Sequence, residues 1–225
     1  MAPPHILFID GLPGSGKSTA ATAIARRLAG ARVFLESAPD HPLLVGVPDT
    51  RGAAFADIHE IHSGDSFAAA ALEKLDGFLA CAEGGTLYVF ESHPLQSTVR
   101  VLLQLDAPEA TILRFWSELQ RRLGSAQPRL VYLQESDPRG ALTDTIRTRG
   151  PAWESYVVDA FNRYPWMQAR GLSGIAGILD MIAQYSALME RLVHLWRFPL
   201  LRLAARPASY QARTAALSEW LARKH

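Results

Sequence analysis

The sequence predicts an α/β fold, with a parallel sheet of about five strands and helices on both faces. Short hydrophobic runs without polar alternation recur along the chain, as strands that are buried on both faces require. Segments with helical periodicity separate these runs, and such alternation is typical of parallel sheets. With 225 residues, of which 48% are hydrophobic, the chain suits a single domain over residues 1–225.

The first predicted strand is HILFID, residues 5–10, a hydrophobic run bounded by two prolines and a glycine. A helix is predicted from Ser18, because hydrophobic residues then recur at helical spacing up to a stop at Gly30. ARVFLES, residues 31–37, predicts the second strand. The stretch that follows is broken by prolines and glycines and is interpreted as a loop.

The rest of the chain alternates in the same way. Hydrophobic runs predict three more strands, GTLYVFES at 85–92, PRLVYLQES at 128–136 and FPLLRLAA at 198–205. Helical periodicity and stop signals predict the helices between and after them, at residues 65–82, 108–123, 137–149, 173–196 and 210–223. Ligands of such sheets bind at the carboxyl ends of the strands, so we expect the functional residues there.

Composition excludes several classes of function. The formal net charge is +1 and there is no sustained basic stripe, so we expect no nucleic-acid partner. Cys81 is the only cysteine, which excludes a disulfide within the chain and a cysteine-based metal site. The longest hydrophobic stretch is interrupted by charges, and the predicted first strand follows the N-terminus closely. We therefore expect a soluble, cytoplasmic protein without a membrane partner.

The turn GLPGSGKS, which begins at Gly11, matches G-x-x-x-x-G-K-[ST] at every fixed position. Glycines let successive backbone N–H groups converge on one anion, and the helix that follows directs its positive end to the same place. Lys17 supplies a charge for the outer phosphates, and the Ser18 hydroxyl can bind Mg²⁺. The predicted nucleotide-binding residues of the turn are Gly11, Pro13, Gly14, Ser15, Gly16, Lys17, Ser18 and Thr19.

This Walker A motif, with a buried strand before it and a helix after it, predicts a P-loop NTPase fold that binds ATP with Mg²⁺. The motif does not name the reaction, because P-loops serve many activities. GTPases usually carry an Asn-Lys-x-Asp tetrapeptide, which this chain lacks. Motor proteins need more chain and further motifs. A small domain with little beyond the loop favours transfer to a small acceptor.

Two stretches resemble known enzymes. FIDGLPGSGKSTAATAIARRL is similar to the opening of thymidylate kinases and of the wider nucleoside and nucleotide kinase superfamily. RLVYLQESDPRGALTDTIRTRG, which ends at Gly150, resembles the strand, turn and short helix that lead to the lid of those enzymes. The resemblance implies a lid at about 137–152 in which Arg149 is the conserved lid arginine, while Arg147 lies out of register.

The chain most closely resembles a bacterial group of kinase-like P-loop proteins, through FLESAPDHP and FESHPLQ. At the end of the third strand, thymidylate kinases carry Asp-Arg and deoxynucleoside kinases Glu-Arg-Ser, whereas this chain has Glu91-Ser92-His93. Because the arginine is missing, the resemblance does not imply thymidylate as the acceptor.

Charge and position suggest roles for the residues that end the strands. The resemblance implies that Glu91 holds Mg²⁺ together with Ser18; a buried acid paired with a neighbour is the alternative. It also implies that Glu36 faces the acceptor hydroxyl as base or anchor. The alternative is that Glu36 is a structural acid, as a helix N-cap or in a loop. Lys17 and Arg149 would neutralise charge during phosphoryl transfer. Arg147 and Arg206 are further candidates for binding the nucleotide, with Arg206 expected beside adenine.

Further residues are assigned to the acceptor pocket. Gln96 and Arg100 follow the third strand, and Asp40 and His41 follow the second, so all four are candidates to touch the acceptor. The segments expected to build the pocket are 37–82 and 108–127, and Trp116, Trp153, Trp166 and Tyr156 are aromatic candidates for its floor. His59 and His62 stand three apart, which does not match a metal-binding H-E-x-x-H pattern.

Together these observations predict an ATP- and Mg²⁺-dependent phosphotransferase that moves the γ-phosphoryl group to a hydroxyl or phosphate of a small molecule. The alternative is a nucleotide-binding switch or regulator with slow hydrolysis. A P-loop sulfotransferase is poorly supported, since the complete lysine–serine arrangement indicates a triphosphate. The expected partner is a small-molecule phosphoryl acceptor, with a homodimer left open.

Overall fold

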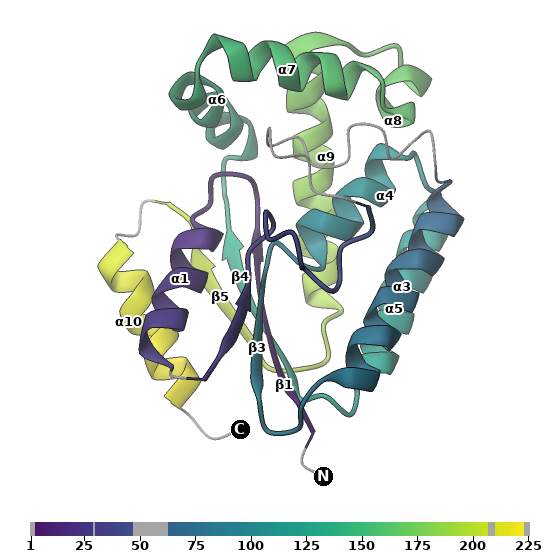
Figure 1. The fold of residues 1–225 in the computed structure, drawn as a ribbon. Coiled ribbons are helices and arrows are strands. Elements are labelled where there is room, and N and C mark those ends of the chain that lie inside the picture. Colours follow the sequence, from purple (N-terminus) through teal and green to yellow (C-terminus); the bar gives the residue numbers. More distant parts are fainter. Residues whose placement is uncertain (1–2, 29, 47–62, 207–209, 223–225) are drawn as a thin grey trace.

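The structure is a computed structural model that describes residues 3–28, 30–46, 63–206 and 210–222. Its centre is a five-stranded parallel sheet in the order β2-β3-β1-β4-β5 (Figure 1). The strands are β1 (His5–Gly11), β2 (Arg32–Phe34), β3 (Leu87–Glu91), β4 (Pro128–Gln134) and β5 (Leu200–Ala204). The predicted α/β fold class, with its parallel sheet of about five strands, is confirmed.

The helices are α1 (Lys17–Arg27), α3 (Gly64–Cys81), η1 (a π-helical turn, Leu95–Val99), α4 (Arg100–Gln104), α5 (Glu109–Leu123), α6 (Pro138–Arg149), α7 (Pro151–Asn162), α8 (Pro165–Ala169), α9 (Gly174–His194) and α10 (Tyr210–Ala222). Helices α1 and α10 cover one face of the sheet, and α3, α5 and α9 cover the other (Figure 1). Helices α6, α7 and α8 stand beyond the carboxyl ends of the strands.

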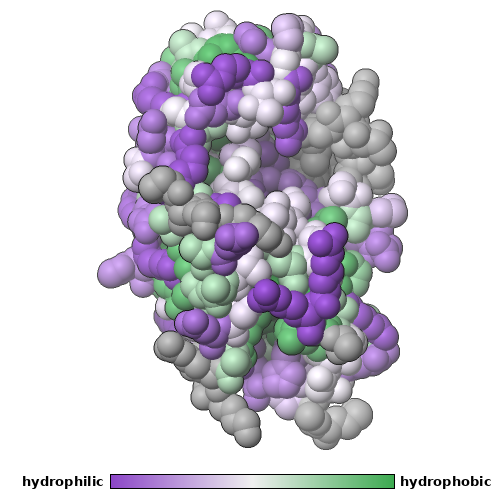
Figure 2. All heavy atoms as spheres, turned by 90° about the vertical axis from the view of Figure 1, so that its left-hand side faces the viewer, coloured by the Kyte–Doolittle hydropathy of each residue, from purple (hydrophilic) through white to green (hydrophobic). Residues whose placement is uncertain are grey.

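Two hydrophobic cores follow from the alternation of side chains along each strand. In β1, Ile6 and Phe8 pack into the core beneath α3, α5 and α9, whereas Leu7 and Ile9 pack beneath α1 and α10. All four are almost completely buried. The outer surface of α1 and α10 mixes hydrophobic and hydrophilic side chains (Figure 2). Burial on both faces explains why β1 has no polar alternation.

The strand register brings the expected functional residues to one edge of the sheet. Ile9 lies opposite Glu91 of β3, and Asp10 lies opposite Tyr132 of β4. The central strands therefore end at the same level. The turn GLPGSGKS that begins at Gly11, here called the phosphate turn, leaves β1 between the ends of its two neighbours.

Two parts of the chain differ from the sequence-based expectation. The second strand covers only residues 32–34 and not the predicted 31–37, because it pairs with β3 alone at the edge of the sheet. Helices α7 and α8 were not predicted. Pro151 opens α7 at the first helical position, where its missing N–H costs no hydrogen bond, so the proline is a start signal as well as a stop.

None of the helices within the described residues is long and hydrophobic enough to cross a membrane.

Candidate functional site

The phosphate turn joins β1 to α1. Gly14 and Gly16 have φ angles of 80° and 95°, which are in the left-handed region that favours glycine. The turn is closed by a hydrogen bond of 3.1 Å from the Ser15 N–H to the Leu12 carbonyl. Within the described residues, the amides of Gly16, Lys17 and Ser18 donate no hydrogen bond, so they are available to an anion at the start of α1.

Gly14 also allows helix α6 to come close. A Cβ atom at this position would lie 2.6 Å from the Thr145 hydroxyl oxygen of α6, closer than non-bonded atoms approach. The glycine therefore has two requirements to meet, its backbone conformation and the space for α6. This contact places α6 directly over the phosphate turn.

Lys17 is buried at the centre of the site, with 4% of its surface exposed. Its ammonium group donates to the Leu12 carbonyl at 2.9 Å and to Gln96 Oε1 at 2.7 Å. Burial lowers the pKa of Lys17, and the nearby carboxylates of Glu36, Asp10 and Glu91 partly offset that effect. A buried cation surrounded in this way is positioned to bind a polyanion that enters the turn.

Glu91 ends β3 and accepts three hydrogen bonds. Oε1 accepts from the Ser18 hydroxyl at 3.0 Å and from the Ser92 hydroxyl at 2.8 Å, and Oε2 accepts from the backbone N–H of Glu36 at 2.8 Å. The carboxylate therefore connects the start of α1 with the ends of two strands.

The predicted Mg²⁺ ligands, Ser18 and Glu91, lie side by side, and both present the oxygen donors that Mg²⁺ prefers. No group of three or more His, Cys, Asp or Glu residues in the described part of the chain could hold a metal ion. A bound Mg²⁺ would therefore take one or two protein oxygens and complete its shell with phosphate and water, as this ion usually does. The residues present fit the ion.

Glu36 lies two residues beyond the end of β2 and faces the same site. Its carboxylate accepts from Gln96 Nε2 at 2.6 Å, and Arg100 Nη2 lies 3.6 Å from Oε1. Because Gln96 also accepts from Lys17, one amide connects the lysine expected to bind phosphate to the expected base. The Glu36 side chain is 22% exposed, so it is open to a ligand.

Asp10 holds the backbone around the site. Its buried carboxylate accepts from the N–H groups of Gly11, Leu95 and Gln96. Burial raises the pKa of Asp10 to about 7, while Lys17 and the backbone N–H groups lower it. The carboxylate thus ties the beginning of the phosphate turn to the π-helical turn that carries Gln96, a type of distortion frequent at functional sites.

A cleft begins at the phosphate turn and extends to helices α6, α7 and α9. Residues of the turn and of the strand ends line one side, and hydrophobic residues of α6, α7 and α9 line the other. The hydrophobic side consists of Leu142, Trp153, Val157, Phe161, Tyr164, Ile178 and Ile182. Three buried polar atoms that border the cleft have no hydrogen-bond partner, namely Arg100 Nε, Gln104 Oε1 and Trp153 Nε1. Unpaired buried polar groups are costly. The part of the cleft that these three atoms border therefore favours a polar ligand.

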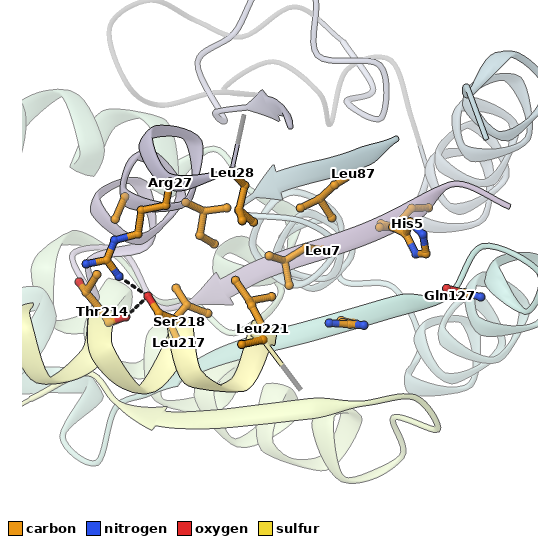
Figure 3. A pocket seen from close by; sticks show the side chains of 15 residues that line it. His5, Leu7, Arg27, Leu28, Leu87, Gln127, Thr214, Leu217, Ser218 and Leu221 are labelled. Carbon is orange, nitrogen blue, oxygen red and sulfur yellow. Dashed lines mark hydrogen bonds between the residues drawn. The ribbon is translucent and has the colours of Figure 1, made fainter. Parts of the chain in front are cut away.

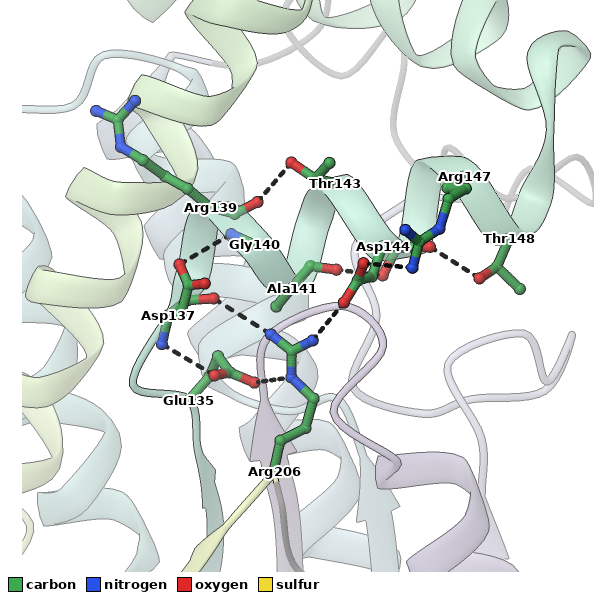
Figure 4. A network of polar contacts seen from close by, with 11 residues as sticks. Glu135, Asp137, Arg139, Gly140, Ala141, Thr143, Asp144, Arg147, Thr148 and Arg206 are labelled. Atoms are coloured by element: carbon green, nitrogen blue, oxygen red, sulfur yellow. Dashed lines mark hydrogen bonds and ion pairs between the residues drawn. The ribbon is translucent and has the colours of Figure 1, made fainter.

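The three expected nucleotide-binding arginines have different surroundings. Arg149 lines the cleft, with its guanidinium carbon 4.8 Å from the centre of the Trp153 ring. Arg147 is exposed and pairs with Asp144 at 2.7 Å. Arg206 contacts Glu135 at 2.9 Å and Asp144 at 2.7 Å, so one carboxylate of α6 holds both arginines (Figure 4).

Several expected pocket residues lie elsewhere. The cleft has no lining residue from 108–127, because the hydrophobic side of α5, including Trp116, packs into the core. His41 is buried against Phe34 and Phe90, and burial lowers its pKa to about 4. Trp166 is buried in the core on α8. The described part of 37–82 contributes no lining residue either, and His59 and His62 lie outside the described residues.

Of the hydrophobic side of the cleft, sequence reasoning named Trp153 as a candidate and missed the other residues, and it also missed Gln104. The signal for α7 was present, since Trp153, Val157 and Phe161 recur at four-residue spacing after Pro151. Gln104 carried no signal, because only the fold brings the end of α4 to the cleft.

A second pocket lies at the opposite end of the sheet, between α1 and α10 (Figure 3). It is mainly hydrophobic and includes His5 and Leu87, which begin β1 and β3. The phosphate turn is at the other end of these strands, so this pocket is separate from the candidate site.

The comparison with solved structures identifies the fold. Deoxyadenosine kinase from M. mycoides, solved with bound dCTP, aligns over 96% of this chain and 98% of its own, with a TM-score of 0.55 and 14% identity. The same enzyme with bound dATP also gives a TM-score of 0.55, with 15% identity over the same shares of both chains. The fold is that of the P-loop NTPases. The resemblance to nucleoside and nucleotide kinases is thereby confirmed at the level of the fold.

Comparisons of the sequence, in contrast to the comparison of structures, find no relative of this chain. No protein-family model matches the chain, and no curated protein matches its sequence. Any statement about its reaction therefore depends on the site itself.

Proposed function

We propose that this P-loop protein is a phosphotransferase, which moves the γ-phosphoryl group of ATP to a hydroxyl or phosphate of a small molecule. The observation that supports it best is the connected series Lys17–Gln96–Glu36 in the cleft. It places a carboxylate open to ligand beside the lysine expected to bind phosphate. A protein that only hydrolyses ATP does not require a carboxylate such as Glu36 in a cleft lined by hydrophobic residues.

The phosphate side of the reaction is assigned to the turn and α1. The free amides of residues 16–18 and the Lys17 ammonium bind the β- and γ-phosphates. Ser18 and Glu91 hold Mg²⁺, which neutralises charge on the phosphates when bound. Glu91 also fixes the backbone of Glu36 through the 2.8 Å hydrogen bond, so the two sides of the reaction share one carboxylate.

The acceptor side is assigned to Glu36. Its carboxylate orients the acceptor hydroxyl and takes its proton as the bond to phosphorus forms. Such transition states are loose, so orientation matters more than early removal of the proton. Arg100 and Gln96 hold the carboxylate in place from either side.

The lid side excludes water. Hydrophobic residues of α7 and α9 cover the cleft, and Arg149 is held at its edge by the Trp153 ring. Exclusion of water protects the phosphoryl group from hydrolysis and strengthens electrostatic contacts inside the cleft. A switch or regulator is the alternative, but it does not account for the unpaired polar atoms that border the cleft.

An acceptor screen tests the proposal. Pure protein and MgATP are incubated with pooled nucleosides, nucleotides, sugars and antibiotics, and ADP release and product mass are measured. With the acceptor found, Glu36→Gln should bind ATP normally and lose acceptor phosphorylation by about 10²- to 10⁴-fold. Glu83→Gln, an exposed acid that pairs with Arg32 and does not line the cleft, is the matched control and should retain the rate.

Two results would contradict the proposal. Equal acceptor-dependent rates in wild type and Glu36→Gln would remove Glu36 from the mechanism. If no acceptor stimulated ADP release across the whole screen, the regulator alternative would be favoured.

A further inference from the structure

Arg213 of α10 reaches the phosphate turn and is not among the residues that line the cleft. Its Nη1 atom donates to the carbonyl of Ser15 at 3.2 Å and also to the carbonyl of Ala205, just beyond the end of β5. A Cβ atom on Gly16 would lie 3.3 Å from Nη2, so the guanidinium lies directly against the turn. Nothing in the sequence motif refers to this residue, which follows the turn by almost 200 positions.

The contact orients one peptide group of the turn. In a trans peptide the carbonyl and the following N–H point in opposite directions. Because Arg213 binds the Ser15 carbonyl, the Gly16 N–H is directed away from α10. That N–H donates to no described residue. A charged donor on the carbonyl also polarises the peptide, which strengthens the hydrogen bond that its N–H can form.

Arg213 adds a positive charge to the start of α1. Gly16 is the N-cap of α1, and the first turn of this helix contains no acidic residue. The positive end of the helix dipole and Arg213 therefore lie together. Among the described residues, the hydrogen-bond partners of Arg213 are the carbonyls of Ser15 and Ala205 and not a carboxylate. A bound polyphosphate would relieve this accumulation.

We propose that Arg213 is a positioning residue of the nucleotide site, which presents the Gly16 amide to the phosphates and adds a positive charge behind the turn. This inference rests on the proposed function, since it requires the turn to bind a polyphosphate. It assigns to α10 a part in nucleotide binding that packing against α1 does not explain.

Arg27 is a matched control. It also connects α1 to α10, through a hydrogen bond to Ser218, but it lies at the far end of α1 from the phosphate turn (Figure 3). Arg27→Gln and Arg213→Gln therefore remove the same chemical group from the same pair of helices. Only Arg213→Gln changes the phosphate turn.

The test measures binding of inorganic tripolyphosphate and of MgATP to the full chain by calorimetry. Arg213→Gln should weaken tripolyphosphate binding about 10-fold or more, as expected for loss of a charge-assisted hydrogen bond. Arg27→Gln should stay within about twofold of wild type, since it leaves the turn intact. Arg213→Lys keeps the charge with fewer donors and should restore part of the affinity. The melting temperature without ligand separates a loss of affinity from a loss of folding.

Each outcome decides the inference. Unchanged tripolyphosphate binding in Arg213→Gln, or an equal loss in Arg27→Gln, would overturn it while leaving the proposed function intact. If Arg213→Gln does not fold, the Arg213→Lys variant decides. Wild-type tripolyphosphate affinity of Arg213→Lys, together with a lowered melting temperature, would show that Arg213 has a structural role only. A wild-type chain that binds neither ligand would overturn the proposed function itself.

Discussion

Replacing Glu91 by glutamine should separate the role of its charge from the role of its shape. The carboxylate accepts hydrogen bonds from two hydroxyls at Oε1 and from one backbone N–H at Oε2. The backbone donor of Glu36 cannot turn, so the glutamine oxygen must face it. The amide nitrogen then faces the hydroxyls of Ser18 and Ser92, which can rotate and accept.

The expected magnitudes differ for folding and for metal binding. Since all three hydrogen bonds can be re-formed, the free energy of unfolding should fall by about 1 kcal/mol or less. Removing an anionic oxygen beside the Ser18 hydroxyl should weaken Mg²⁺ about 10- to 100-fold, equivalent to about 1.4 to 2.8 kcal/mol. Binding of nucleotide without metal should change little, because the amides and Lys17 are unaffected.

The assay titrates Mg²⁺ against ADP release at fixed ATP, and urea unfolding is measured in parallel. Glu135→Gln is the matched control, since this carboxylate also follows a central strand and is 4% exposed, but it contacts Arg206. The Mg²⁺ concentration for half-maximal rate should rise only in Glu91→Gln. An unchanged half-saturation point and rate in Glu91→Gln would refute the metal role and leave a purely structural acid.

Three further predictions follow from the site. Lys17→Ala should keep its circular dichroism spectrum but lose about 10²-fold or more in turnover, and wild-type turnover would contradict the assignment of the phosphate turn. Asp144→Asn releases Arg147 and leaves Arg206 paired with Glu135 alone, so MgATP should bind up to about fivefold more tightly by calorimetry. Weaker binding would show that the Asp144 pairs assemble the site. Burial lowers the pKa of His41 to about 4, so the unfolded chain takes up a proton near pH 6.5 and the folded chain does not. The free energy of unfolding should fall as pH drops from 6.5 to 4, by up to about 3 kcal/mol from this group, and His41→Asn should remove that part of the slope.

The sequence by itself determined the features that depend on neighbouring residues. The phosphate turn is local, because its glycines, lysine and serine act through backbone conformation and through the helix that follows at once. The strands were recognisable because a parallel sheet buries both faces and leaves long hydrophobic runs, as in 5–10 and 85–92. Placing Glu36 and Glu91 near one another followed from the rule that such strands end at one edge.

The tertiary structure decided which side chains meet. Gln96 lies between Lys17 and Glu36 because the Asp10 carboxylate accepts hydrogen bonds from the backbone N–H groups of Leu95 and Gln96. The contact between Asp10 and Gln96 spans 86 positions, and no local pattern encodes it. Arg206 was expected beside adenine, yet its long side chain reaches the carboxylates of Glu135 and Asp144.

The surroundings of Trp153 and Arg213 were likewise not predictable from the sequence. Trp153 joins the cleft while Trp116 joins the core, although both stand on helices of hydrophobic periodicity. Arg213 meets the turn only because β5 and α10 return the chain to α1. A sequence specifies the conformation of its own short segments, whereas contacts between distant segments depend on how their buried faces pack. The phosphate turn and its neighbour Glu91 were therefore predictable, whereas Gln96 and Arg213 as partners of the turn were not.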